Sequence, residues 1–183
     1  MKSYLITDPS YYYTLSDFQT YLQNIYQKHQ PDIACFRDKV NNDIVPYAKR
    51  FLTLSRERGI SLLLLNGSVS LAQTLGFDGV HLTSTQSDEI ISAKAAGLYV
   101  FISTHSVSEA QKAQDLGADA VTLSPVFATP GKGEPKGIAF LKEALSQLDN
   151  ISVFALGGII SDTETEMLKG TGVDGFASIR YFI

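Results

Sequence analysis

The feature that most constrains the fold is a regular alternation of short apolar runs with longer amphipathic segments. The runs predict eight strands, over Tyr4–Thr7, Ile33–Arg37, Ser61–Leu65, Gly79–Leu82, Tyr99–Ser103, Ala120–Ser124, Ser152–Leu156 and Gly175–Ile179. Most runs are continuously apolar, which is typical of parallel strands buried on both faces. Eight units of this kind favour closure over an open sheet. We therefore predict an α/β protein, a compact (β/α)8 TIM barrel.

The segments between the runs have the periodicity of helices. They predict helices over Thr14–His29, Ile44–Arg58, Ser68–Leu75, Ser87–Ala96, Ser106–Leu116, Gly137–Leu148 and Asp162–Lys169. Ser106 and Glu109 have the spacing of a capping box. A Gly-x-Asp pattern ending in Asp78, Asp119 and Asp174 recurs where a helix ends and a strand begins. Such repeated, tight helix-to-strand turns indicate a parallel sheet.

Length and the last strand define the domain prediction. The 183 residues are enough for one domain of ordinary size and too few for two. We find no linker, so we predict a single barrel domain over residues 1–183. Only a few residues follow the eighth strand, so the last helix is expected to be truncated or missing. An apolar flank would then lie between the first and seventh helices, where a second copy in a homo-oligomer could cover it.

Charge and cysteine content limit the function classes. The net charge is −4, so no overall basic field attracts nucleic acid or anionic lipid. The N-terminus reaches Asp8-Pro9 without a signal-type apolar stretch, and no uncharged apolar run approaches the ~20 residues of a membrane helix. Cys35 is the single cysteine, which excludes an intramolecular disulfide and a cysteine metal cage. We expect a cytoplasmic protein with small-molecule partners, and with no nucleic acid or membrane partner.

Basic residues follow the second strand, near the expected active-site end of the barrel. Arg37 and Lys39 are two residues apart, so an extended backbone points both side chains the same way. Two cations there could bind a phosphate or a diphosphate. They could equally form a solvated pair balanced by Asp38 and Asp43.

Other strand ends carry weaker signals. After the third strand, Asn66-Gly67 is a common turn dipeptide. In the fourth strand, His81 is either a packed residue or a proton shuttle. After the fifth strand, the hydroxyls around Ser103 either bind a ligand or cap a helix. The long loop 127–136 after the sixth strand contains Thr129 and Lys132, which could clamp an anion.

The strongest local signal is the pair Gly157-Gly158 after the seventh strand, followed by Ser178-Ile179 after the eighth. Barrels of this class often bind phosphate between these two loops. Glycines let the backbone approach the anion, and a helix N-terminus can point amides at it. The sequence therefore predicts a phosphate site at this place.

Taken together, the motifs resemble the thiamine phosphate synthase/TenI family along nearly the whole chain. The similar segments are Tyr4-Leu5-Ile6-Thr7, Phe36-Arg37-Asp38-Lys39, Leu65-Asn66, Gly79-Val80-His81-Leu82, Ser103-Thr104-His105-Ser106, Gly117-Ala118-Asp119, Ser124-Pro125-Val126-Phe127-Ala128-Thr129 with Lys132, and Leu156-Gly157-Gly158-Ile159. Synthases of this family couple hydroxymethylpyrimidine diphosphate to thiazole phosphate and release diphosphate.

The resemblance implies a role for each candidate residue. Arg37, Lys39 and Lys132 would be catalytic, around the departing diphosphate. Asn66, Ser103 and Thr129 would complete the pyrimidine diphosphate site, and Gly157, Gly158, Ser178 and Ile179 would hold the thiazole phosphate. Mg²⁺ would take part if the protein is an active synthase.

The chain departs from the synthase pattern at the expected metal ligands. Gly67 stands where synthases have an Asp after the strand-three Asn, and Gln86 stands where they have the Asp that follows strand four. Mg²⁺ prefers carboxylate oxygen and water, so both losses weaken its site, and we assign no metal-binding residue. Cys35 replaces a family Gln, and Gly131 replaces a Thr next to the loop lysine.

Three functions remain open from the sequence. The first is a transferase of the thiamine phosphate synthase type that tolerates a degraded metal site. The second is a TenI-like thiazole phosphate tautomerase. Gly67 favours the tautomerase, but Pro125 stands where that branch has its His, so His81 or His105 would have to act instead. The third is a non-catalytic, regulatory protein that binds thiazole or thiamine phosphate. The retained cations favour the synthase.

Overall fold

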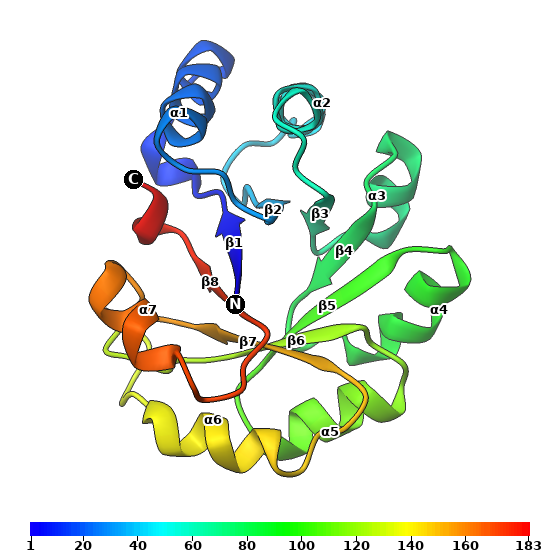
Figure 1. The fold of residues 1–183 in the computed structure, drawn as a ribbon. Coiled ribbons are helices and arrows are strands. Elements are labelled where there is room, and N and C mark those ends of the chain that lie inside the picture. Colours follow the sequence, from blue (N-terminus) through cyan, green and yellow to red (C-terminus); the bar gives the residue numbers. More distant parts are fainter.

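The computed structural model describes residues 1–183 as eight parallel strands closed into a barrel in sequence order, with β1 paired to β8 (Figure 1). The strands are β1 Lys2–Ile6, β2 Ile33–Phe36, β3 Leu62–Asn66, β4 Gly79–Leu82, β5 Tyr99–Thr104, β6 Ala120–Leu123, β7 Ser152–Leu156 and β8 Gly175–Ser178. Each predicted strand is present, with ends that shift by at most two residues. The predicted (β/α)8 barrel is confirmed.

Seven α-helices surround the barrel in Figure 1. They are α1 Leu15–Lys28, α2 Val45–Glu57, α3 Val69–Leu75, α4 Ile90–Ala95, α5 Val107–Asp115, α6 Gly137–Leu145 and α7 Asp162–Leu168. The predicted fourth helix starts as a 3-10 turn, η2 (Ser87–Glu89), before it becomes α4. Two further 3-10 turns, η1 (Pro9–Tyr11) and η3 (Arg180–Phe182), were not predicted.

The predicted capping box at α5 is only half formed. The Ser106 hydroxyl accepts the amide of Glu109, but the Glu109 carboxylate accepts the amide of His105, one residue before the cap. Complete boxes occur instead at α1, between Thr14 and Asp17, and at α7, between Ser161 and Glu164. Each satisfies amides that a helix start otherwise leaves unpaired.

The buried side chains form two cores on opposite sides of the strand wall. An inner core of nine residues fills the barrel: Tyr4, Ile6, Ile33, Cys35, Leu64, Phe101, Ala120, Phe154 and Ala177. An outer core of 40 residues lies between the strands and the helices. Side chains alternate along each strand, so neighbours such as Tyr4 and Leu5 belong to different cores. Packing on both faces explains the continuous apolar runs in the sequence.

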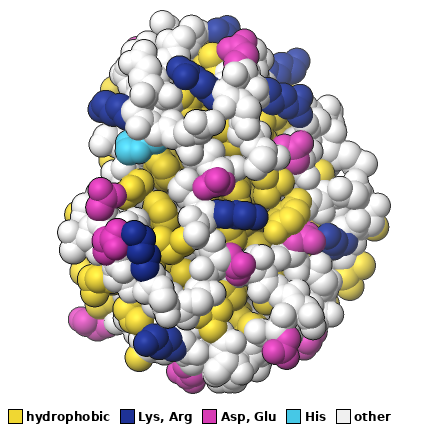
Figure 2. Space-filling model, in the orientation of Figure 1, with side chains coloured by type: hydrophobic (Ala, Val, Ile, Leu, Met, Phe, Trp, Pro, Cys, Tyr) yellow, Lys and Arg dark blue, Asp and Glu magenta, His cyan; other side chains and the backbone are white.

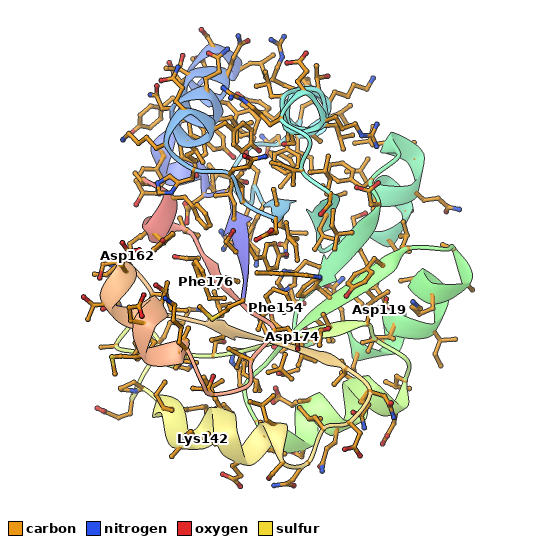
Figure 3. The ribbon with its side chains drawn as sticks, viewed as in Figure 1. Asp119, Lys142, Phe154, Asp162, Asp174 and Phe176 are labelled. Atoms are coloured by element: carbon orange, nitrogen blue, oxygen red, sulfur yellow. The ribbon has the colours of Figure 1, made fainter.

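An aspartate stands just before each even-numbered strand and holds the preceding strand. The carboxylates of Asp78, Asp119 and Asp174 accept the amides of Leu63, Val100 and Val153 at 2.7–2.8 Å. The amide of each aspartate donates back to the carbonyl of the same partner residue. Asp119 and Asp174 lie close to the strands in Figure 3.

The fourth member of this set does not follow the Gly-x-Asp pattern. Asp32 precedes β2, and its carboxylate accepts the amide of Ser3 in β1 at 2.8 Å, while its own amide donates to the Ser3 carbonyl. The Gly-x-Asp repeat thus marks three of four equivalent clamps, which fix how β1–β2, β3–β4, β5–β6 and β7–β8 align.

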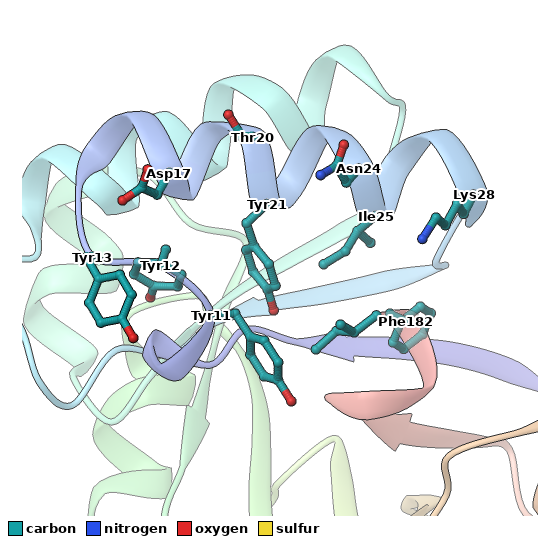
Figure 4. Close-up of a pocket in the computed structure, with 11 residues that line it drawn as sticks. Tyr11, Tyr12, Tyr13, Asp17, Thr20, Tyr21, Asn24, Ile25, Lys28 and Phe182 are labelled. Carbon is teal, nitrogen blue, oxygen red and sulfur yellow. The ribbon is translucent and has the colours of Figure 1, made fainter.

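The residues after β8 fold back over the flank that was expected to be open. Phe182 of η3 is 2% exposed, and its ring stacks on Phe176 and meets His29 edge-on. Beside it, a cavity of about 430 Å³ remains between α1 and η3, lined partly by Tyr11 and Tyr21 (Figure 4). The chain therefore covers part of this flank itself, and the predicted homo-oligomer remains a prediction.

The outer surface is mixed in charge. On the face shown in Figure 2, basic side chains are more frequent over the upper part, near α1 and α2, whereas most acidic side chains lie over the middle and lower parts. None of the helices has the length and apolar character needed to span a bilayer.

The aspartate clamps lead to a stability prediction. Asp174→Ala removes the acceptor for the amide of Val153, a residue that is 1% exposed. We expect the free energy of unfolding to fall by about 1–2 kcal/mol, because a buried amide is left unpaired at a partly solvated site. Urea denaturation measures this loss. The control is Asp115→Ala, since this exposed aspartate at the end of α5 holds no strand, and an equal loss in both variants would contradict the clamp.

Candidate active site

A cavity of about 600 Å³ opens at the C-terminal ends of the strands. It is lined by residues that end or follow all eight strands. The ten candidate residues from the sequence all lie on its wall: Arg37, Lys39, Asn66, Ser103, Thr129, Lys132, Gly157, Gly158, Ser178 and Ile179. The fold therefore brings together residues that are up to 142 positions apart in the chain.

The cavity is positively charged although the chain as a whole is negative. Its lining includes Arg37, Lys39, Lys132 and Arg180, whereas Asp8 is the one carboxylate, 3.8 Å from the Arg37 guanidinium. A concave wall that carries charge of one sign concentrates ligands of the opposite sign. The arrangement is suited to a polyanionic ligand.

The backbone at Arg37 is fixed by a buried threonine. Thr7, which is fully buried, accepts the Arg37 amide at 2.8 Å and donates to the Arg37 carbonyl at 3.0 Å. The alternative of a basic pair balanced by Asp38 and Asp43 is not what the structure shows. Asp38 accepts hydrogen bonds from Tyr12 and from its own loop, and Asp43 accepts the amide of Val45, the first residue of α2.

Four backbone amides on the β7–β8 side of the cavity have no partner within the protein. They are the N–H groups of Gly157, Gly158, Ile159 and Ile179, all of which line the cavity. Buried backbone donors are nearly always paired, and Ile159 is 1% exposed. Converging free amides form an anion-binding concavity. This arrangement is suited to a phosphate.

The two glycines also make room for a neighbouring loop. A Cβ on Gly157 would lie 2.9 Å from the Pro125 Cα, and a Cβ on Gly158 would lie 2.6 Å from the Ala128 carbonyl oxygen. Both residues have positive φ, +98° and +70°. The absent side chains thus make room for the loop after β6, which pairs with this segment through the Phe127 amide and the Gly157 carbonyl.

The free amides of Gly157, Gly158 and Ile159 lie before the start of α7, and that of Ile179 directly precedes η3. The Glu164 carboxylate accepts the amides of Ile160 and Ser161, which occupies the helix entrance. Likewise, the Ser178 hydroxyl donates to the Ile159 carbonyl at 2.7 Å and accepts the Tyr181 amide. Ser178 therefore positions the loops through its side chain, and the donors that face the cavity belong to the backbone.

His81 is held in the barrel wall and is not a free base. It is 2% exposed, its Nδ1 lies 2.6 Å from the Tyr4 hydroxyl, and its Nε2 lies 3.1 Å from the Ser103 hydroxyl. Burial, with the nearby charge of Arg37, lowers the pKa of His81 from 6.5 to about 3. His81 is therefore neutral near pH 7, and a proton-shuttle role does not fit it.

His105 lines the cavity, and Cys35 lies in the inner core of the barrel. His105 is tied through Nδ1 to the Ser124 carbonyl at 3.0 Å, and its Nε2 makes no hydrogen bond. Cys35 is fully buried, and burial raises the pKa of its thiol to about 12, so it is not a nucleophile at neutral pH.

The two positions where metal carboxylates were expected are joined by a hydrogen bond. The Gln86 side-chain amide donates to the Gly67 carbonyl and to the Glu89 carboxylate, both at 2.8 Å. Its oxygen accepts the Thr83 amide and hydroxyl. The Gln86 amide is therefore fully used within the protein, and this donor set does not fit Mg²⁺, which prefers carboxylates and water.

Sequence reasoning missed two charged residues of the cavity. Asp8 follows β1, and Arg180 follows Ile179 after β8. A consistent inspection of the residues just beyond each strand end would have found both, because the barrel gathers these positions at one mouth.

The glycine geometry gives a testable prediction. Gly158→Ala places a methyl group against the backbone of the β6 loop at positive φ, so we expect a loss of about 2 kcal/mol or more in unfolding free energy. Gly133→Ala is the matched control, since it has similar φ but open space around the new Cβ. Equal losses would show that φ strain alone matters and would contradict the close approach of the loop.

The state of His81 gives a pH prediction. Because its folded pKa is lowered, the unfolded chain binds a proton below about pH 6.5 that the folded chain does not bind, so stability is lost as the pH falls. Between pH 7 and pH 5 this group alone costs roughly 2 kcal/mol. Urea denaturation at both pH values should show a pH-dependent loss smaller by that amount in His81→Gln. An unchanged pH dependence would contradict the neutral buried state.

The chain is similar in sequence to curated thiamine-phosphate synthases. Its sequence is 32% identical over 150 residues to a putative thiamine-phosphate synthase 2 of Aquifex aeolicus, covering 80% of this chain and 79% of that protein. It is also 32% identical over 137 residues to the thiamine-phosphate synthase of Bacillus velezensis, covering 73% of this chain but only 60% of that relative.

The solved structures show a similar relation. The thiamine phosphate pyrophosphorylase from Pyrococcus furiosus superposes with a TM-score of 0.79 at 29% identity, covering 97% of this chain and 85% of that one. A family model described as thiamine monophosphate synthase matches residues 3–182. The chain therefore belongs to the thiamine monophosphate synthase family.

Proposed function

We propose that residues 1–183 act as one barrel unit that catalyses thiamine phosphate synthesis from hydroxymethylpyrimidine diphosphate and thiazole phosphate. One observation carries this proposal: a single cavity contains both a set of basic side chains and a set of unpaired backbone amides. A reaction that joins a diphosphate ester to a second, phosphorylated molecule needs two such anion sites. Family membership and the names of the relatives support the same reaction.

In the chemical step, negative charge develops on the leaving diphosphate, and the basic side chains must stabilise it. The bond between the pyrimidine methylene carbon and the diphosphate oxygen breaks, and its electron pair leaves with the diphosphate. The lone pair of the thiazole nitrogen then forms the new C–N bond to the cationic methylene group. Arg37, Lys39 and Lys132 would stabilise the charge that develops on the leaving group, and fixed charges in a cavity do this without reorganisation.

The remaining candidates would bind and orient the two substrates. Ser103 and Thr129 present hydroxyl groups to the cavity, and Asn66 is oriented by its hydrogen bond to the His81 carbonyl at 3.0 Å. The free amides of Gly157, Gly158 and Ile179 would hold the thiazole phosphate. A phosphate held there fixes the thiazole ring relative to the methylene carbon. Binding then already supplies the loss of translational and rotational entropy that the reaction needs.

We propose that this chain offers Mg²⁺ no carboxylate site of its own at Gly67 and Gln86. The saturated amide of Gln86 supports this. The basic side chains would then carry the diphosphate charge, and any Mg²⁺ would arrive with the substrate.

The direct test is synthesis by the purified protein. The two phosphorylated precursors are incubated with the protein, with Mg²⁺ or with a chelator, and thiamine phosphate is measured. We expect product in both arms, faster with Mg²⁺. No product at high protein concentration would contradict the synthase. Conversion of a thiazole carboxylate phosphate tautomer instead would select the tautomerase, and thiazole phosphate binding without either reaction would select the non-catalytic binder.

Two variants test which residues belong to which of the two anion sites. Arg37→Ala and Lys132→Ala should each lower kcat/KM at least about tenfold, as expected for loss of a charged contact to the leaving group. The affinity for thiazole phosphate, measured by calorimetry, should hardly change in these variants. Equal effects on both quantities would contradict the separation of the two sites.

A further inference from the structure

A chain of hydrogen bonds runs from the barrel interior to the wall of the cavity. Tyr4 on β1 is fully buried, and its hydroxyl lies 2.6 Å from Nδ1 of His81 on β4. Nε2 of His81 lies 3.1 Å from the hydroxyl of Ser103 on β5, which lines the cavity. Neither Tyr4 nor His81 has an assigned role in the proposed reaction.

Burial fixes the direction in which the protons point. The Tyr4 hydroxyl makes one hydrogen bond, to His81; the neighbouring Cys35 thiol is a much weaker acceptor than an imidazole nitrogen. A buried phenol must donate its hydrogen, so Nδ1 of His81 accepts it. The single proton of the neutral ring then lies on Nε2 and is donated to Ser103.

This direction determines what Ser103 can offer a ligand. Its oxygen already accepts the proton from His81, and no group of the protein accepts its own hydrogen. The hydroxyl hydrogen is therefore available to the cavity. We propose that Tyr4 and His81 are positioning residues that hold Ser103 as a hydrogen-bond donor to the diphosphate of the bound substrate. This inference rests on the proposed function.

The charge distribution agrees with a donor at this place. Arg37 lines the same cavity and lies close enough to His81 to oppose its protonation. A protonated His81 ring would donate to Tyr4 as well, so the hydrogen bonds from Tyr4 through His81 to Ser103 would no longer all point the same way. With a neutral ring, Ser103 adds a donor of fixed direction to the basic side chains around the anion, and it needs no reorganisation when charge develops.

The first experiment reads the proton positions without any substitution. The full-length protein is labelled with ¹⁵N-histidine, and its ring nitrogens are observed by NMR between pH 8 and pH 5. We expect His81 to carry its proton on Nε2 throughout. A proton on Nδ1, or a charged ring near pH 6, would overturn the proposal.

The second experiment tests whether Tyr4 acts through Ser103. Binding of inorganic diphosphate is measured by calorimetry for the wild type, Tyr4→Phe, Ser103→Ala and the double variant. Ser103→Ala should weaken binding about tenfold or more, as expected for a hydrogen bond to a charged group, and Tyr4→Phe should weaken it less. The double variant should bind no more weakly than Ser103→Ala alone. Losses that multiply would overturn the positioning role.

A matched control separates positioning from general destabilisation. Tyr26→Phe removes another buried phenol, whose hydroxyl lies 2.7 Å from Ser55 in the outer core, away from the cavity. It should lower Tm about as much as Tyr4→Phe and leave diphosphate binding unchanged. Weaker binding in Tyr26→Phe would overturn the proposal. If the wild type binds no diphosphate, the proposed function fails as well, whereas binding with multiplicative losses overturns only the role of Tyr4 and His81.

Discussion

The rest of the structure depends on the pairing of each aspartate before an even-numbered strand with the strand that precedes it. Asp32, Asp78, Asp119 and Asp174 each accept one backbone amide and donate their own amide to the same residue. Parallel strands have no tight hairpin to set their register, and a slip of one residue would exchange the inner and outer cores. The clamps lie at the N-terminal ends of the strands, so they fix the register while the C-terminal ends remain free to carry the cavity.

Registered strands place unrelated loops around one cavity, and the loops then constrain each other. The segment after β7 can approach the loop after β6 only because Gly157 and Gly158 lack side chains. That approach leaves their amides, with those of Ile159 and Ile179, directed away from any protein acceptor. The same packing that stabilises the two loops thus leaves four amides free to bind a phosphate, and two arginines and two lysines line the same cavity although the chain as a whole is negatively charged.

Much of the fold could be predicted because burial on both faces leaves continuous apolar runs, and because the Gly-x-Asp repeat marks three of the four clamps. The 3-10 turns η1 and η3 could not, since three residues carry no periodic signal. The positions of most candidate site residues followed from the strand ends, whereas Thr129 and Lys132 were found in the long loop after β6. The chemistry of these residues could not be predicted, because it depends on partners that are distant in the sequence. Examples are the tautomer of His81, the hydrogen bonds that Ser178 and Gln86 make within the protein, and the contact of Gly158 with the loop after β6.

The central claim is that one cavity holds two anions by different means, basic side chains for a diphosphate and backbone amides for a phosphate. A crystal structure of the protein with thiazole phosphate and inorganic diphosphate tests this most directly. The account predicts the phosphate within hydrogen-bond distance of the amides of Gly157, Gly158 and Ile179, and the diphosphate against Arg37, Lys39 and Lys132. A thiazole phosphate bound by the basic side chains, with the four amides facing only water, would contradict it.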